Sequence, residues 1–175
     1  MYSILSSFAQ ALARWMAYAG GAVLLIVVGL TCISIAGRAL LPFNLGVGPI
    51  KGIYDITEIG MAAAVFAFLP WCQVQRGHAA VDLFEPVFPP LLNRLLDLLF
   101  DGAMFAVALV VTYRMYLGMA DKMRYGETTQ IAQIPVWYGY AASLVGAAAF
   151  VLVAAFCVIR AARALVRGKA DGAHV

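Results

Sequence analysis

Charged residues are scarce in this sequence, and their scarcity excludes a water-soluble globular domain. Only 12% of the 175 residues are charged, while 64% are hydrophobic. A soluble domain carries about 25% charged residues and about 45–50% apolar ones. With half the usual charge, the chain cannot cover a water-facing surface of its size. The sequence therefore predicts an integral membrane protein.

Residues that hold metals, haem or disulfides are also few. The only histidines are His78, in an expected loop, and His174, in the tail, so no pair of helical histidines can ligate a haem. The three cysteines are scattered along apolar runs and lack metal-ligand spacing. No glycine-rich phosphate loop is present, and no nucleophile has a suitable base near it in the sequence. We expect no cofactor, no metal site and no enzymatic activity.

The net charge of +3 does not indicate nucleic-acid binding, because it comes from a cluster in the tail. Four basic residues lie within ten positions directly after an apolar run: Arg160, Arg163, Arg167 and Lys169. Such a cluster is typical of the cytoplasmic end of a membrane helix.

Four apolar stretches are long enough to cross a bilayer, which takes about 20 helical residues. Proline suits the first turn of a helix, so Pro135 is expected to open the last of them. We predict a single all-α membrane domain over residues 1–175, with four transmembrane helices at about 15–37, 54–75, 95–116 and 135–159. Before the first crossing, Leu5, Phe8 and Leu12 recur at helical spacing, which predicts a short helix on the membrane surface. A disordered terminus is the alternative.

Lysines and arginines set the expected orientation. With four crossings, both termini share a side with the 74–94 loop, and that side carries seven of the twelve basic residues. The opposite side carries the other five: Arg38, Lys51, Arg114, Lys122 and Arg124. The positive-inside rule then predicts that both termini are cytoplasmic, a choice that depends on the basic tail.

The loop between the second and third helices holds an unusual polar stretch, VQRGHAAVDLFEP. One reading makes Arg76, His78 and Asp82 part of a solvated connector. The other makes them a docking point for a partner or a lipid headgroup, because the neighbouring residues are too apolar for water. The sequence leaves both readings open.

Acidic residues lie near the starts of the second and third helices. Asp55 and Glu58 resemble a capping arrangement at the positive end of the second helix. Arg94, Asp97 and Asp101 share one face of the third helix at spacings of three and four. Because charge is costly inside a bilayer, Asp101 is expected to pair with Arg94 or with a cation on a partner. The middles of all four helices lack ionisable residues, so the chain offers no evident transport site of its own.

Two ordered motifs carry a resemblance to a known family. The run EIGMAAAVFAFLPWCQVQRGHAAVDLF, from Glu58 to Phe84, resembles the second helix and following loop of the small membrane subunit of tripartite ATP-independent periplasmic (TRAP) transporters. GETTQ at 126–130, followed by IPVW at 134–137, is similar to that family's entry into the fourth helix. The chain departs from the family pattern in having one residue rather than two between Arg76 and His78. It departs again at Pro70-Trp71, where a glycine- and alanine-rich stretch is expected.

The resemblance implies a function and partners. In such systems a large multi-spanning subunit carries the sodium and substrate sites, and a periplasmic solute-binding protein delivers a substrate that is usually a carboxylate-bearing metabolite. The small subunit acts as a scaffold in the bacterial inner membrane. We therefore expect contacts with the large subunit or with lipids at Glu58, Arg76, His78, Asp82, Arg94, Asp97 and Asp101. Docking of the binding protein is expected at Lys51, Asp121, Lys122, Arg124 and Glu127, with an ordinary solvated loop as the alternative.

Two other classes of function remain open. The first is a self-sufficient homo-oligomeric transporter or channel, which would need an ionisable residue in mid-membrane. The second is a membrane anchor for a redox enzyme, which would bind a chromophore.

Overall fold

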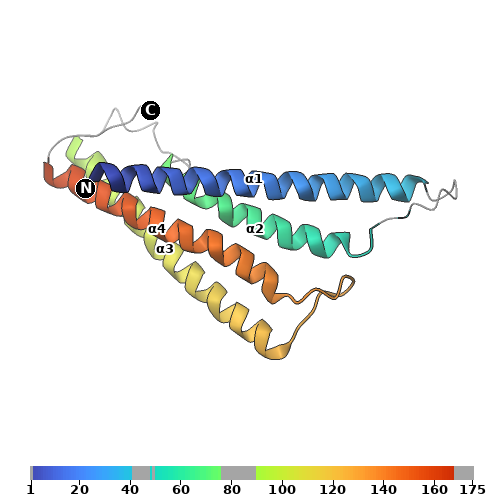
Figure 1. Ribbon diagram of the computed structural model, residues 1–175. Coiled ribbons are helices and arrows are strands. Elements are labelled where there is room, and N and C mark those ends of the chain that lie inside the picture. The colour runs from blue at the N-terminus through green and yellow to red at the C-terminus, as the bar shows by residue number, and fades with distance from the viewer. Residues whose placement is uncertain (1, 41–47, 49, 76–89, 168–175) are drawn as a thin grey trace.

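Four long helices make up the described part of a computed structural model (Figure 1). The structure describes residues 2–40, 48, 50–75 and 90–167. The helices are α1 (Tyr2–Leu40), α2 (Ile53–Val74), α3 (Pro90–Tyr125) and α4 (Trp137–Arg167). All four contain segments long and apolar enough to cross a membrane. For the described residues, the prediction of an all-helical fold with four helices able to span a membrane is confirmed.

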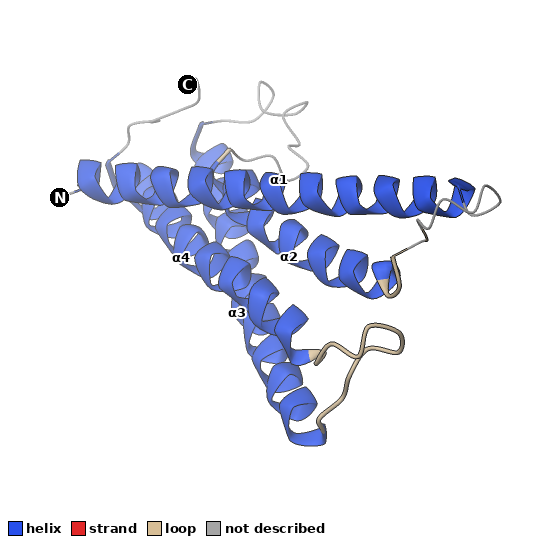
Figure 2. Ribbon diagram, turned by 45° about the vertical axis from the view of Figure 1, so that its right-hand side comes forward, coloured by secondary structure: helices blue, strands red, loops and turns tan. Residues whose placement is uncertain are grey.

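The order of the helices in space differs from their order in the chain. α2 lies between α1 and α4, α3 packs on the far side of α4, and α1 touches α4 over a shorter stretch. α1 and α2 diverge from α3 and α4 toward one end of the molecule (Figures 1 and 2). We call this the hairpin end, because the connection 126–136 between α3 and α4 lies there. The start of α1 and the end of α4 lie together at the opposite, terminal end.

α1 is longer than one crossing requires. Its 39 residues extend about 58 Å at the usual helical rise, against about 30 Å for the hydrocarbon layer. The surface helix expected before residue 15 is therefore not a separate element but the first turns of α1. There Ala9 and Ala13 are buried against Val153, Phe156 and Cys157 of α4. These turns are held by α4.

α3 also runs beyond the segment expected for it, 95–116. Its apolar part is interrupted by charged residues, Asp101 among them. The charge-free stretch from Gly102 to Tyr113 has 12 residues, about 18 Å of helix, which is too short for the hydrocarbon layer. Asp101, however, is only 7% exposed and is hydrogen-bonded inside the protein. Because Asp101 is buried, the exposed apolar residues of α3 extend back past it to Leu99 and Phe100.

Small residues bring α2 and α4 into close backbone contact. A Cβ atom on Gly146 would lie 2.6 Å from the carbonyl carbon of Phe66 and 2.9 Å from the amide nitrogen of Ala67. Only glycine fits so close an approach. Association of membrane helices depends on packing of this kind, because lipid tails are as apolar as leucine.

Candidate functional site

The connection between α3 and α4 forms a tight hairpin with a fixed shape. Thr129 N–H donates to the Ile134 carbonyl over 2.8 Å, and Val136 N–H donates to the Glu127 carbonyl over 3.0 Å. Pro135 forms a bridge with Thr128 inside this hairpin, and α4 begins only at Trp137. Pro135 thus lies at the junction of the hairpin and α4, two residues before the helix, and its carbonyl accepts a hydrogen bond from Tyr138 N–H over 3.1 Å.

Asp55 anchors the hairpin to α2. Its Oδ2 accepts hydrogen bonds from the backbone N–H groups of Ile131, over 3.1 Å, and Ala132, over 2.8 Å. The N-cap of α2 is Gly52, and no side chain caps that end. The capping role predicted for Asp55 is thus wrong, since its carboxylate binds backbone from a segment 76 residues later in the chain. Gly52 has φ +77°, and a Cβ there would lie 2.5 Å from that of Ala132.

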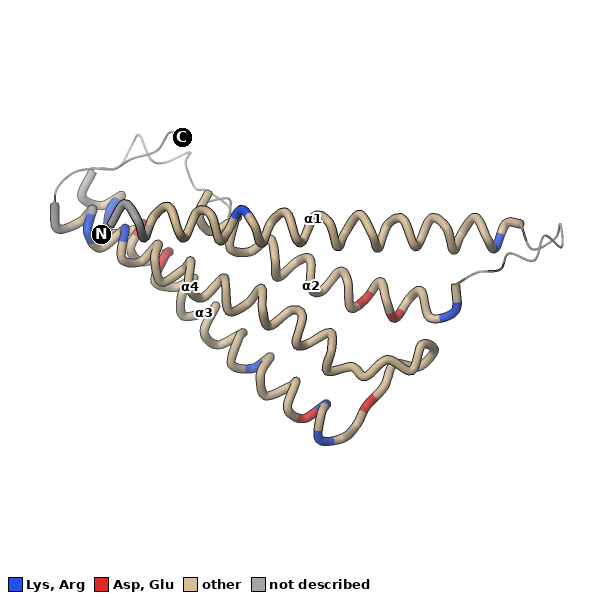
Figure 3. Tube along the Cα trace, in the orientation of Figure 1, with Lys and Arg blue, Asp and Glu red and all other residues tan. Residues whose placement is uncertain are grey.

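The charged residues predicted to dock a binding protein all lie at or near the hairpin end (Figure 3). Lys122 and Glu127 form an ion pair that ties the last turns of α3 to the hairpin. Lys51, Asp121 and Arg124 are exposed. Of the five predicted docking residues, these three are therefore the ones that present exposed charge without a part in the hairpin.

A buried polar contact lies toward the terminal end. The Gln73 side-chain amide of α2 donates to Asp101 Oδ1 of α3 over 3.1 Å, and the two residues are 3% and 7% exposed. Cys157 Sγ of α4 lies 3.9 Å from the Gln73 carbonyl oxygen, so three helices meet at this point. Gln73 is a residue that the sequence analysis missed. Its signal was a lone amide near the end of α2, after a long apolar run that begins at Ile59.

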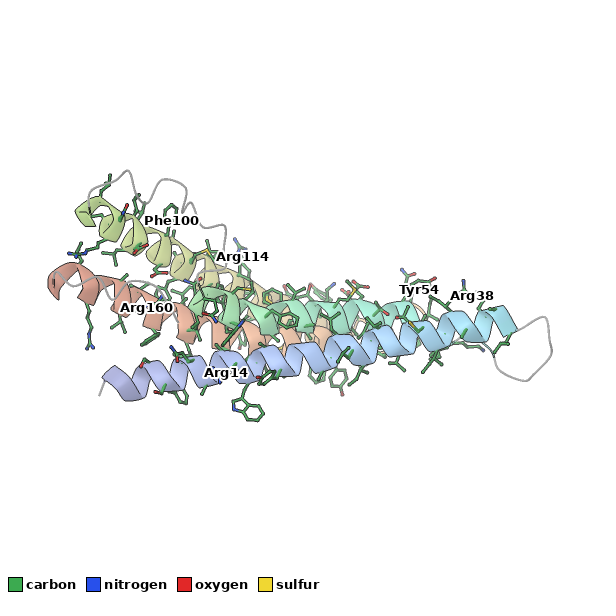
Figure 4. All side chains as sticks on the ribbon, turned by 90° about the horizontal axis from the view of Figure 1, so that it is seen from above. Arg14, Arg38, Tyr54, Phe100, Arg114 and Arg160 are labelled. Carbon is green, nitrogen blue, oxygen red and sulfur yellow. The ribbon has the colours of Figure 1, made fainter. Side chains whose placement is uncertain are left out.

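Basic residues surround the same end. Arg94 and Asp97 are half-buried on α3, one turn apart. The guanidinium of Arg14 lies over the Trp71 ring, 5.8 Å from its centroid, which links α1 to α2 by a cation–π contact. Figure 4 shows Arg14 and Arg160 on the side of the molecule opposite Arg38 and Tyr54. Arg76, His78 and Asp82 lie outside the described residues, so their predicted role is not placed.

Glu58 lies apart from both groups. It is exposed on α2, among exposed apolar residues, at the half of that helix nearer the hairpin end. The residues predicted from sequence therefore do not form one site. Among those that the structure describes, they divide into the hairpin end, the polar contact near the terminal end, and Glu58 on the outer face of α2.

An apolar pocket lies between α1, α2 and the beginning of α4. Its lining includes Val27 from α1, Ile59 from α2 and Ile134 from the hairpin, and the Tyr138 hydroxyl is the one side-chain polar group among its nine lining residues. No group of three or more His, Cys, Asp or Glu side chains that could hold a metal ion occurs within residues 2–40, 48, 50–75 and 90–167. This pocket lacks the charges and oxygen ligands that a carboxylate or a sodium ion needs.

Comparison with known proteins gives one match. The model of the family described as tripartite ATP-independent periplasmic transporters, DctQ component, matches residues 27–167. No curated protein and no solved structure matches the chain. The match runs from within α1 to the end of α4 and covers the hairpin, the Gln73–Asp101 contact and the outer face of α2. The chain is a multi-pass membrane protein and belongs to the DctQ component family of TRAP transporters.

Proposed function

We propose that this chain is the small scaffold subunit of a sodium-driven TRAP importer in a bacterial inner membrane. In this proposal it binds and stabilises the large multi-spanning subunit, which carries the sodium and substrate sites. A periplasmic solute-binding protein brings the substrate to the assembled complex. Family membership implies association with other TRAP components and carries the proposal.

The chemistry of the helices favours a scaffold and not a path for a charged solute. The charge-free cores of α1, between Trp15 and Gly37, and of α4, between Trp137 and Ile159, contain no ionisable acid or base other than cysteine and tyrosine. The buried carboxylate of Asp101 is engaged with Gln73 of α2. Transport of a charged solute needs side chains or freed backbone near the midplane, and intramembrane ionisable residues mark such pathways.

The two ends of the molecule are assigned to opposite sides of the membrane. The terminal end, with Arg14, Arg94, Arg160 and Arg163, is assigned to the cytoplasm by the positive-inside rule. The hairpin end then faces the periplasm, where the binding protein arrives. Lys51, Asp121 and Arg124 present exposed charge to it.

The cytoplasmic turn between α2 and α3 is proposed to contact the large subunit or lipid headgroups through Arg76, His78 and Asp82. The apolar residues beside them support this role, because such a loop needs a cover. The half-buried Arg94 and Asp97 lie at the start of the helix that follows this turn.

Co-expression with the large subunit tests the function. The small chain should co-purify with the large subunit in a fixed ratio, and uptake into cells should require both chains together with the binding protein. Deleting the gene of the small chain should lower the recovery or the thermal stability of the large subunit. If the large subunit is equally stable and active without this chain, the scaffold proposal fails.

A further inference from the structure

α2 has an exposed stripe on the face that it turns away from the pocket. Tyr54 and Met61 are 66% and 52% exposed, Val65 is 56% exposed, and Glu58 and Ala62 are exposed as well. These five residues lie at spacings of four, three, one and three, so they follow one face of the helix. We call them the Glu58 stripe. Figure 4 labels Tyr54, the residue of the stripe that lies nearest the hairpin end.

The opposite side of α2 packs against its neighbours and borders the apolar pocket. Gly60 lies against Val27 of α1, and the backbone at Phe66 lies against Gly146 of α4. Because α2 is held between α1 and α4, its exposed stripe has a fixed direction. A partner protein that docks on α2 would therefore contact this stripe.

The two acids of α2 differ in how their charge is satisfied. Asp55 accepts two backbone hydrogen bonds from the hairpin. Glu58 lies one turn further into the helix and is exposed, and it makes no hydrogen bond or ion pair to any residue that the structure describes. Charged side chains within membrane helices pair with one another, with backbone or with water. Within the described part of the chain, the charge of Glu58 is therefore left for a partner to satisfy.

The other exposed faces differ from the stripe. The exposed residues of α1 between Trp15 and Gly37, of α3 between Gly102 and Tyr113, and of α4 between Trp137 and Ile159 carry no formal charge. Such faces suit the acyl chains of lipids. The Glu58 stripe combines apolar area with a carboxylate, which suits a protein surface that offers a cation.

A second copy of this chain is a poorer occupant of the stripe. Two copies related by a two-fold axis present the same patch to each other. Both Glu58 carboxylates would then lie near the same axis, and two like charges in a low-dielectric interface repel each other.

We propose that the Glu58 stripe is the docking face for the large membrane subunit, and that this subunit places an arginine or lysine opposite Glu58. The inference rests on the proposed function and adds the face and the chemistry of contact. The apolar residues on either side of Glu58 exclude water from the ion pair, and the pair fixes the register of the two proteins.

Paired substitutions on two helices test the proposal. The chain is co-expressed with the large subunit, and the affinity of the purified complex is measured in detergent. Met61→Trp and Val65→Trp add bulk to the stripe. Val107→Trp and Val110→Trp are matched controls on α3, since those residues are 52% and 60% exposed. Glu58→Lys reverses the charge, and Glu58→Gln keeps an acceptor oxygen.

The expected result is a pattern confined to α2. Glu58→Lys and the two tryptophan variants of the stripe should weaken binding by at least about tenfold, and Glu58→Gln by less. The α3 variants should bind like the wild type. Replacing membrane-embedded arginines and lysines of the large subunit by glutamate, one at a time, should then restore the binding of Glu58→Lys at one position.

Three results would overturn the proposal. The first is that the stripe variants bind the large subunit as tightly as the wild type, which is expected if the stripe faces lipid. The second is that the α3 variants lose binding instead. The third is that cysteines placed at Met61 in two copies of this chain crosslink to each other in the intact complex, which would make a second copy the occupant. If Glu58→Lys alone lowers the helical content of the purified chain, the tryptophan variants decide. Failure of the wild-type chain to bind the large subunit would refute the proposed function instead.

Discussion

Gln73 donates a hydrogen bond to Asp101 over 3.1 Å, and this contact joins two helices that otherwise meet little. No pair of Cα atoms from α2 and α3 comes within 8 Å among the described residues. The two side chains span the distance between α2 and α3, which both pack on α4. One oxygen of a buried carboxylate thereby accepts a hydrogen bond within the protein, and the carboxylate is kept away from the exposed face of α3.

Removing the hydrogen-bond donor Gln73 should lower the stability of the protein, because the Asp101 carboxylate stays buried. Gln73→Leu leaves Asp101 buried with one hydrogen bond fewer, so the free energy of unfolding should fall by about 1–3 kcal/mol. Gln75→Leu is the matched control, because Gln75 is exposed two residues further along. Thermal unfolding in detergent measures both. Equal stability of the two variants would mean that the contact contributes nothing.

The hairpin should loosen when Asp55 is changed. Asp55→Ala removes the acceptor of the Ile131 and Ala132 amides, so hydrogen exchange at those two amides should quicken. Asp55→Asn keeps one acceptor oxygen and should give an intermediate rate, because hydrogen bonds to a charged acceptor are stronger. Glu58→Ala should leave both amides at the wild-type rate. Unchanged exchange in Asp55→Ala would contradict the anchoring role.

Adding one methyl group at Gly146 should separate α2 from α4. Gly146→Ala places a Cβ against the backbone of Phe66, and overpacking of this kind costs about 1–3 kcal/mol. Gly102→Ala is the control, since a Cβ there meets nothing within 4 Å and alanine favours a helix. Unfolding of the purified chain should therefore show a loss in the first variant and none in the second. A Gly146→Ala chain as stable as the wild type would show that the two helices can adjust freely.

Charge reversal at the hairpin end should separate docking from shape. Arg124→Glu and Lys51→Glu change exposed charges that have no part in the hairpin, so they should slow uptake while the complex still assembles. Lys122→Ala acts through its ion pair with Glu127, and its effect should be matched by Glu127→Ala. Solute uptake at two salt concentrations measures this, because a charged docking contact weakens with salt. If uptake is unchanged in Arg124→Glu and Lys51→Glu, these residues belong to an ordinary solvated loop and do not dock the binding protein.

The number of membrane-spanning helices could be predicted from sequence, because long charge-poor apolar stretches leave few alternatives. Helix length could not, since α1 and α3 continue past the apolar core where contacts with neighbouring helices replace lipid. Ala9 and Ala13 show why: an alanine face gives little signal until a second helix lies against it.

The site residues were harder to predict. Asp55 follows the local pattern of a helix cap, yet its carboxylate binds a hairpin that lies far along the chain. The position of Asp101 predicted a need for a partner, but Gln73 stands 28 residues earlier and no local pattern connects them. Contacts between helices depend on packing order, and that order places α4 between α2 and α3.

Reconstitution of the purified chain into liposomes tests the central claim, which is that this protein supports a transporter and does not move solute itself. With a sodium gradient and a binding protein loaded with a labelled carboxylate, the chain alone should give no uptake above empty liposomes. Adding the large subunit should produce sodium-dependent uptake. Uptake by this chain without the large subunit would contradict the account.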